Sequence, residues 1–210
     1  MTDISTLFQK AKQAKASVIF AHGAGAGKNS DFLNFVSEQL VSQGINVLRF
    51  NFPYMDKREF DGKRRPPDRM PKLLECLAKV VDDNPTDLPL FLMGKSMGGR
   101  VSATFAKMNG EKVKGVICLG YPFHPQKQPE KLRLEPLQKL TKPVLIVQGD
   151  RDALGSKDDI SHYELSSLCQ LNFLPDGDHD LKPRVKSGYT HRQHLDSTIT
   201  LINGFINEFS

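Results

Sequence analysis

Features that the sequence lacks narrow its class. It has only three cysteines, Cys76, Cys118 and Cys169, which lie far apart in apolar runs. An odd number of isolated cysteines favours buried thiols in a reducing compartment over a disulfide framework or a zinc site. No window approaches the roughly 18 apolar residues that span a bilayer, and the N-terminus has no signal-peptide core. We therefore expect a cytoplasmic protein with no membrane partner.

The chain also lacks repeats and low-complexity tracts. Its 210 residues are enough for one domain with its own hydrophobic core, so we expect a single domain over residues 1–210. The net charge is +5, and much of the positive charge lies in "DKREFDGKRRPPDR", residues 56–69. This segment has none of the interleaved aromatics of nucleic-acid modules, so no nucleic-acid partner is expected.

Short apolar runs alternate with segments of helical periodicity. Strands are predicted at residues 17–22, 45–52, 88–94, 113–123, 143–149 and 169–175, and helices at residues 30–44, 67–83, 96–110, about 160–168 and 192–209. The strands are almost continuously apolar, which is typical of a sheet covered by helices on both faces. The order predicts an α/β fold with a doubly wound, mostly parallel sheet of about six strands. Functional residues should then follow the carboxyl ends of the strands.

The glycine-rich stretch "VIFAHGAGAGKNSDF", residues 18–32, allows two interpretations. A Walker-type phosphate loop would need glycine where His22 stands and a hydroxyl where Asn29 stands, so that motif fails. The spacing of Gly23, Gly25 and Gly27 also fails the dinucleotide fingerprint. A glycine-rich turn without chemistry and half of an oxyanion hole remain open. His22 is expected to brace the loop by hydrogen bonds rather than to transfer protons.

The segment "LFLMGKSMGGRV" favours the oxyanion hole. Residues 94–98 match G-x-S-x-G between a predicted strand and a predicted helix, which is the context of a nucleophile elbow with Ser96 at its tip. Gly94 and Gly98 would let neighbouring backbone pass close by. The oxyanion donors would be the amide of Met97 and, from the first loop, that of Ala24, with Gly25 second.

A serine nucleophile needs a base, and the base needs an acid. Asp150 and Asp152 follow the strand at 143–149, and His179 follows the last strand, in the chain order serine, acid, histidine. Asp152 is favoured over Asp150, which should lie within the turn itself. His191 and His194 have metal-like spacing but no third ligand nearby, so a solvated surface is expected and no metal.

With "FAHGAGAG", "GKSMGG", "GDRD" and "GDHD" in this order, the sequence resembles small α/β-hydrolases of the dienelactone-hydrolase-like branch. More narrowly, it resembles bacterial relatives of testis-expressed protein 30 and of the hydrolase-like domain in the third regulatory subunit of the non-specific lethal chromatin complex. The resemblance implies Ser96 as nucleophile, Asp152 as acid, His179 as base, and Ala24 and Met97 as oxyanion donors. Dienelactone hydrolases have cysteine at the position of Ser96, so a lactone substrate is not implied.

The chain departs from the family pattern in being a minimal core. The chain has no insertion long enough for a full cap domain, and we expect no antiparallel strand ahead of residue 17. The expected function is a serine hydrolase for an ester, thioester or related acyl compound, acting through an acyl-enzyme without metal or organic cofactor. A non-catalytic scaffold that binds a partner, and an acyltransferase with the same residues, are the alternatives.

The basic segment 56–69 is expected to be a mobile flap at the substrate entrance. Lys63, Arg64 and Arg65, with Lys95 beside the serine, would then attract a small acyl substrate that carries an anionic group. The competing interpretation is that these charges are only solvated, because acidic residues alternate with them.

Overall fold

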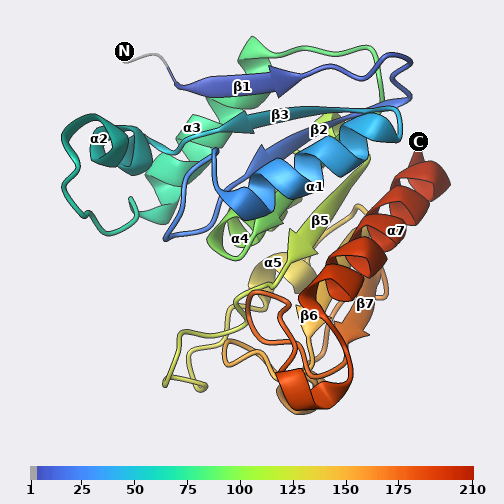
Figure 1. The fold of residues 1–210 in the computed structure, drawn as a ribbon. Helices are drawn as coiled ribbons and strands as arrows, with labels where there is room; N and C mark the ends of the chain where they lie inside the picture. The colour runs from blue at the N-terminus through green and yellow to red at the C-terminus, as the bar shows by residue number, and fades with distance from the viewer. Residues whose placement is uncertain (1–3) are drawn as a thin grey trace.

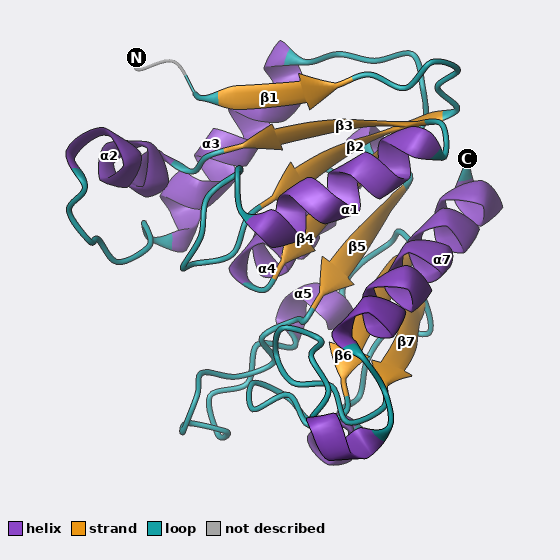
Figure 2. Cartoon of the chain, viewed as in Figure 1, coloured by secondary structure: helices purple, strands orange, loops and turns teal. Residues whose placement is uncertain are grey.

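The computed structural model describes residues 4–210 and has a seven-stranded sheet at its centre (Figures 1 and 2). The strand order is β1-β3-β2-β4-β5-β6-β7. Strands β2 to β7 run parallel, and β1 pairs antiparallel with β3 at the edge. The strands are β1 Thr6–Gln9, β2 Ala16–Ala21, β3 Ile45–Phe50, β4 Leu90–Lys95, β5 Gly115–Leu119, β6 Val144–Gly149 and β7 Cys169–Leu174.

Helices cover both faces of this sheet. In Figure 1, α1 and α7 lie in front of it, and α3 and α4 lie behind. The helices are α1 Asp31–Ser42, α2 Pro53–Asp61, α3 Met70–Asp83, α4 Met97–Met108, α5 Glu135–Gln138, α6 Lys157–Ile160 and α7 His191–Phe209, with short 3₁₀ turns at Gly110–Lys112 and Val185–Ser187. Within residues 4–210, none of the helices is both long and apolar enough to cross a bilayer.

The sheet separates two hydrophobic cores because successive side chains of a strand point to opposite faces. On β2, Val18 and Phe20 pack with the α1 and α7 residues, whereas Ile19 and Ala21 pack with the core of α3 and α4. Both sets are buried. This burial explains why the strands are continuous apolar runs, as predicted.

Local sequence signals set the ends of the two front helices. Gly44, just beyond α1, has a φ of 81°, a left-handed conformation that glycine adopts without a side-chain clash. Helix α7 begins with a capping box in which Thr190 and Gln193 each satisfy the other's backbone N–H. These ends direct the chain into and out of the sheet at the positions that the sequence predicts.

Three elements differ from the sequence prediction. The expectation of no antiparallel strand ahead of residue 17 was wrong, because β1 pairs with β3; it is short and mostly exposed, which leaves little apolar signal. The basic segment was expected to be a flap, yet residues 53–61 form α2, which buries only Tyr54 and Met55 and so shows little periodicity. The helix predicted at about 160–168 was wrong, because the four-residue α6 ends at Ile160 and residues 161–168 form no helix.

Candidate active site

Ser96 lies in a tight turn between β4 and α4. Its φ of 51° is unusual for a residue with a side chain, and its N–H donates to the carbonyl of Leu119 on β5. A Cβ on Gly94 would lie 2.1 Å from the backbone of Gly98, and a Cβ on Gly98 would lie 2.4 Å from the carbonyl oxygen of Ala21. The predicted reason for both glycines, close passage of neighbouring backbone, is therefore confirmed.

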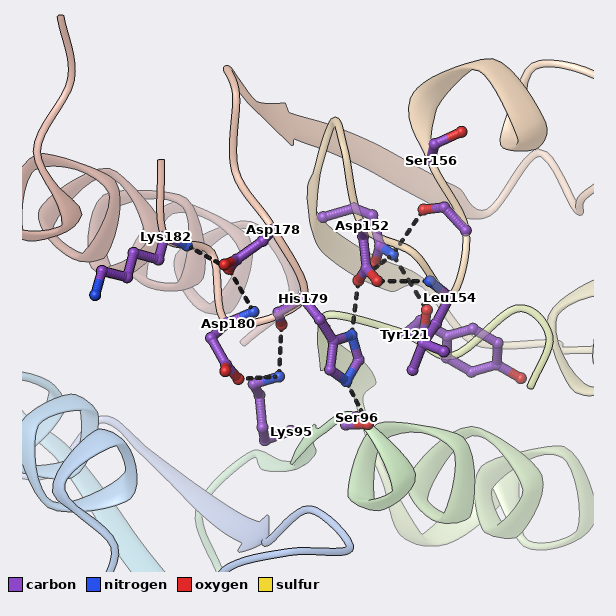
Figure 3. A network of polar contacts seen from close by, with 12 residues as sticks. Lys95, Ser96, Tyr121, Asp152, Leu154, Ser156, Asp178, His179, Asp180 and Lys182 are labelled. Carbon is purple, nitrogen blue, oxygen red and sulfur yellow. Dashed lines mark hydrogen bonds and ion pairs between the residues drawn. The ribbon is translucent and has the colours of Figure 1, made fainter. Parts of the chain in front are cut away.

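The side chains of Ser96, His179 and Asp152 form one hydrogen-bonded chain (Figure 3). The Oγ of Ser96 is 2.8 Å from Nε2 of His179, and Nδ1 of His179 is 2.8 Å from Oδ2 of Asp152. The three residues follow β4, β7 and β6, at the carboxyl edge of the sheet. The structure thus brings together the residues that the sequence singled out.

Asp152, rather than Asp150, faces the histidine. Its side chain is fully buried, its Oδ1 accepts the N–H of Leu154 at 2.8 Å, and its Oδ2 accepts from Nε2 of Gln148 at 2.9 Å. The Oδ1 of Asp150 is buried without a hydrogen-bond partner among the described residues. Sequence reasoning missed Gln148; the available signal was a polar residue at the end of an apolar strand.

The turn that carries His179 is fixed from two sides (Figure 3). Oδ1 of Asp178 accepts the N–H groups of Asp180 and Lys182, which closes the turn. The Nζ of Lys95 donates to the carbonyl oxygen of His179 at 2.7 Å and pairs with Asp180 at 3.3 Å. Burial lowers the pKa of Lys95, and Asp180 acts in the opposite direction. Lys95, predicted to bind substrate, borders the same cavity as Ser96 and His179, and its ammonium group also holds the histidine turn.

The glycine-rich loop lies against the elbow. A Cβ on Gly23 would lie 3.7 Å from Cβ of Ser96, so the two turns touch. Ala24 borders both of the cavities, described below, that Ser96 borders. Met97 is the first residue of α4, so the N–H of Met97 has no acceptor within the helix. The two predicted oxyanion residues therefore both lie beside the serine.

His22 braces this loop, as expected. It is fully buried, and its Nδ1 donates to the carbonyl of Gly23 at 2.6 Å while its Nε2 accepts the N–H of Phe52 at 3.0 Å. Only the neutral Nδ1–H tautomer can make both bonds. Burial lowers the pKa of His22 to about 4. The hydroxyl of Tyr54 adds a bond to the carbonyl of Ala24 at 3.0 Å.

Ser96 lies between two cavities. The large cavity, about 850 Å³, also borders His179 and the starts of α1 and α7, and its apolar lining includes Phe32, Phe35 and Leu195. The small cavity, about 350 Å³, borders Met97 and Arg100 on α4 together with Met70, Leu73, Pro122, Pro125 and Arg133. A molecule bound across the serine would place one part in each cavity.

The other predicted site residues lie elsewhere. Lys63, Arg64 and Arg65 border neither cavity, and Arg65 pairs with Asp61. The expectation that His194 is solvated was wrong, because it is buried with Nδ1 against the carbonyl of Leu181. Across residues 4–210, no three His, Cys, Asp or Glu side chains are grouped as metal ligands.

The same substitution should have opposite effects on stability at two glycines, one in the elbow and one on α7. Gly98→Ala forces a Cβ against the carbonyl of Ala21, so we expect a loss of more than about 2 kcal/mol in unfolding free energy. Gly204→Ala, at an exposed position of α7 with no atom within 4 Å, should stabilise by about 1 kcal/mol. Urea unfolding measures both, and equal stabilities would contradict the close backbone contact.

His22 predicts a pH dependence of stability. The folded chain keeps this imidazole neutral down to about pH 4, whereas the unfolded chain protonates it below about 6.5. The contribution of His22 to the unfolding free energy should be fully present above pH 6.5. It should fall by up to roughly 3 kcal/mol as the pH drops from 6.5 to 4. Chemical denaturation of wild type and His22→Gln across this range should show a shallower slope in the variant; parallel curves would contradict it.

Comparison with solved structures shows the same fold in several hydrolases. A dienelactone hydrolase from Anabaena variabilis matches with a TM-score of 0.75 and 21% identity, over 98% of this chain and 92% of its own. Est1E from Butyrivibrio proteoclasticus matches at 0.72 and 19%, over 98% and 93%. An α/β serine hydrolase without lid from Xanthomonas campestris matches at 0.67 and 19%, over 100% and 96%. These similarities confirm the predicted fold.

A family model described as "Alpha/beta hydrolase domain" matches residues 14–207. The match includes every strand from β2 to β7, the elbow and both loops that carry Asp152 and His179. The chain therefore belongs to the α/β-hydrolase domain family.

Proposed function

We propose that this chain is a serine hydrolase that cleaves an ester, a thioester or a related acyl compound through an acyl-enzyme intermediate. One observation carries the proposal. The hydroxyl of Ser96 is hydrogen-bonded to a histidine whose other ring nitrogen is held by the buried carboxylate of Asp152. This arrangement suits a hydroxyl group that must lose its proton as it attacks a carbonyl carbon.

In the first half of the reaction, Oγ of Ser96 attacks the acyl carbon and Nε2 of His179 takes its proton. Asp152 keeps the proton of the neutral ring on Nδ1, which leaves Nε2 free to act as a base, and it stabilises the imidazolium that forms. The charge that develops on the carbonyl oxygen would be stabilised by the amides of Met97 and Ala24. Because both amides belong to braced turns, little reorganisation is needed when the charge appears.

The same histidine then returns its proton to the leaving group, which departs as an alcohol or thiol. A general acid must lie within hydrogen-bond reach of the atom that it protonates. His179 borders the large cavity and not the small one, so we place the leaving group in the large cavity and the acyl group in the small one. Water then attacks the acyl-enzyme with His179 as base, and the acid is released.

The narrower assignment is also part of this proposal. The four sequence motifs support kinship with bacterial relatives of testis-expressed protein 30 and of the hydrolase-like domain of the non-specific lethal complex. The three free cysteines support a reducing compartment such as the cytoplasm. A scaffold without turnover and transfer of the acyl group to an acceptor other than water are the competing outcomes of the tests below.

Covalent labelling tests the nucleophile. A fluorophosphonate probe should modify Ser96 in the folded wild type, because the histidine activates that hydroxyl, and Ser96→Ala should abolish labelling. Ser102→Ala is the matched control, since Ser102 lies buried on α4, which follows Ser96, and borders neither cavity. Mass spectrometry locates the adduct, and thermal unfolding checks the fold. A folded wild type that stays unlabelled would favour the scaffold.

Two substitutions separate the aspartates. Asp152→Asn should lower kcat on a 4-nitrophenyl ester on the order of 10³-fold or more, because the amide stabilises the wrong tautomer of His179. Asp150→Asn should cost far less, because its carboxylate does not contact the histidine. Steady-state kinetics measures both variants. If Asp150→Asn caused the larger loss, the assignment of the acid would be wrong.

A further inference from the structure

Two arginines border the small cavity beside Ser96. Arg100 lies one helical turn after the serine, on α4, and Arg133 lies in the irregular segment that precedes α5. Both side chains are only partly exposed. Two half-buried arginines therefore border the space next to the proposed nucleophile.

Neither arginine has a carboxylate partner within residues 4–210. The ion pairs of this part of the chain involve neither residue, and Nε of Arg100 is buried without a hydrogen-bond partner. Burial lowers the pKa of Arg133, and the positive charge of Arg100 lowers it further. Two like charges that are partly desolvated and unpaired cost free energy, which a bound anion would recover.

The one carboxylate among the residues that line the small cavity is already engaged. Oδ2 of Asp68 accepts the N–H of Tyr54 at 2.9 Å, and its Oδ1 pairs with Nζ of Lys72 at 2.8 Å. The cavity therefore carries a net positive charge. This contrasts with the exposed basic segment, where Arg65 pairs with Asp61.

The backbone holds both arginines in place relative to the serine. The N–H of Arg133 donates to the carbonyl of Phe123 at 2.7 Å, and its carbonyl accepts the hydroxyl of Tyr121 at 2.9 Å. The N–H of Arg100 donates to the carbonyl of Ser96 at 3.2 Å in the first turn of α4. These bonds fix the backbone from which both side chains extend.

We propose that the small cavity binds the acyl group of the substrate and that Arg100 and Arg133 bind a carboxylate at the far end of that group. The substrate would then be an ester or thioester of a short dicarboxylic acid. This inference rests on the proposed function, which places the leaving group on the His179 side. A guanidinium group suits the recognition because its N–H fork matches a carboxylate.

The test compares two esters that differ by one charge, 4-nitrophenyl hydrogen glutarate and its neutral methyl ester. In the wild type, kcat/KM should be higher for the anionic ester. Arg100→Met and Arg133→Met should each lower the ratio of the anionic to the neutral kcat/KM on the order of 10- to 100-fold, as expected for a charge-assisted hydrogen bond. Arg64→Met is the control, because it removes an exposed charge that borders neither cavity, and its ratio should stay within about twofold of wild type.

A binding measurement makes the test independent of turnover. Calorimetric titration of Ser96→Ala with 4-nitrophenyl hydrogen glutarate should show binding that Arg133→Met weakens about 10-fold and Arg64→Met does not. If Arg100→Met proved unfolded in a thermal scan, Arg133→Met and the charge-preserving Arg100→Lys would be compared with the wild type instead.

The outcomes separate the two proposals. Hydrolysis of both esters with a ratio that neither arginine variant changes would overturn the anion site and leave the hydrolase intact. A wild type that is neither labelled nor active would overturn the hydrolase, and the titration would still decide the anion site. If Arg64→Met lowered the ratio as much as Arg133→Met, long-range charge rather than the cavity would be responsible, and the inference would fail.

Discussion

The site depends on the close passage of the end of β2 against the start of α4. Gly98 brings the backbone of α4 so near the carbonyl of Ala21 that no side chain fits between them. Next to this contact, the loop of Ala24 lies beside Ser96, and the serine has a positive φ of 51°. Residues with positive φ persist only where the surroundings over-determine them. The serine is therefore held by packing against a neighbouring strand rather than by local preference.

Buried polar side chains near the carboxyl ends of three strands make the surrounding loops rigid. His22 after β2, Lys95 at the end of β4 and Gln148 near the end of β6 are each buried. Each donates to a backbone carbonyl of a neighbouring turn, and the acceptor for Gln148 is Gly155 in the turn of Asp152. A buried polar group without a hydrogen bond costs free energy, so each of these bonds favours the turn conformation that makes it. The loop of Ala24, the turn of His179 and the turn of Asp152 are thus positioned by interior groups.

Much of this site was predictable from the sequence because motifs that follow parallel strands must meet at one edge of the sheet. That rule brought Ser96, Asp152 and His179 together across distances that no local pattern encodes. The rest depended on contacts that a sequence does not show. Short or weakly buried elements such as β1 and α2 leave little periodicity. The many basic residues near Arg65 led to the prediction that they attract the substrate. Whether an arginine is paired with a carboxylate, however, is a property of the folded chain.

In the proposed function, the residues that react and the residues that select the substrate lie on different parts of the fold. The hydrogen-bonded chain and the elbow are built on strand ends of the sheet, which the α/β-hydrolase domain family shares as a scaffold. The small cavity instead takes Arg133 from an irregular segment between β5 and β6, and such segments tolerate sequence change far better than a core strand does. Under the proposed function, a change in that segment would alter which acyl group fits without moving Ser96 or His179. Family membership therefore carries information about the reaction, and information about the substrate has to come from the residues that line these cavities.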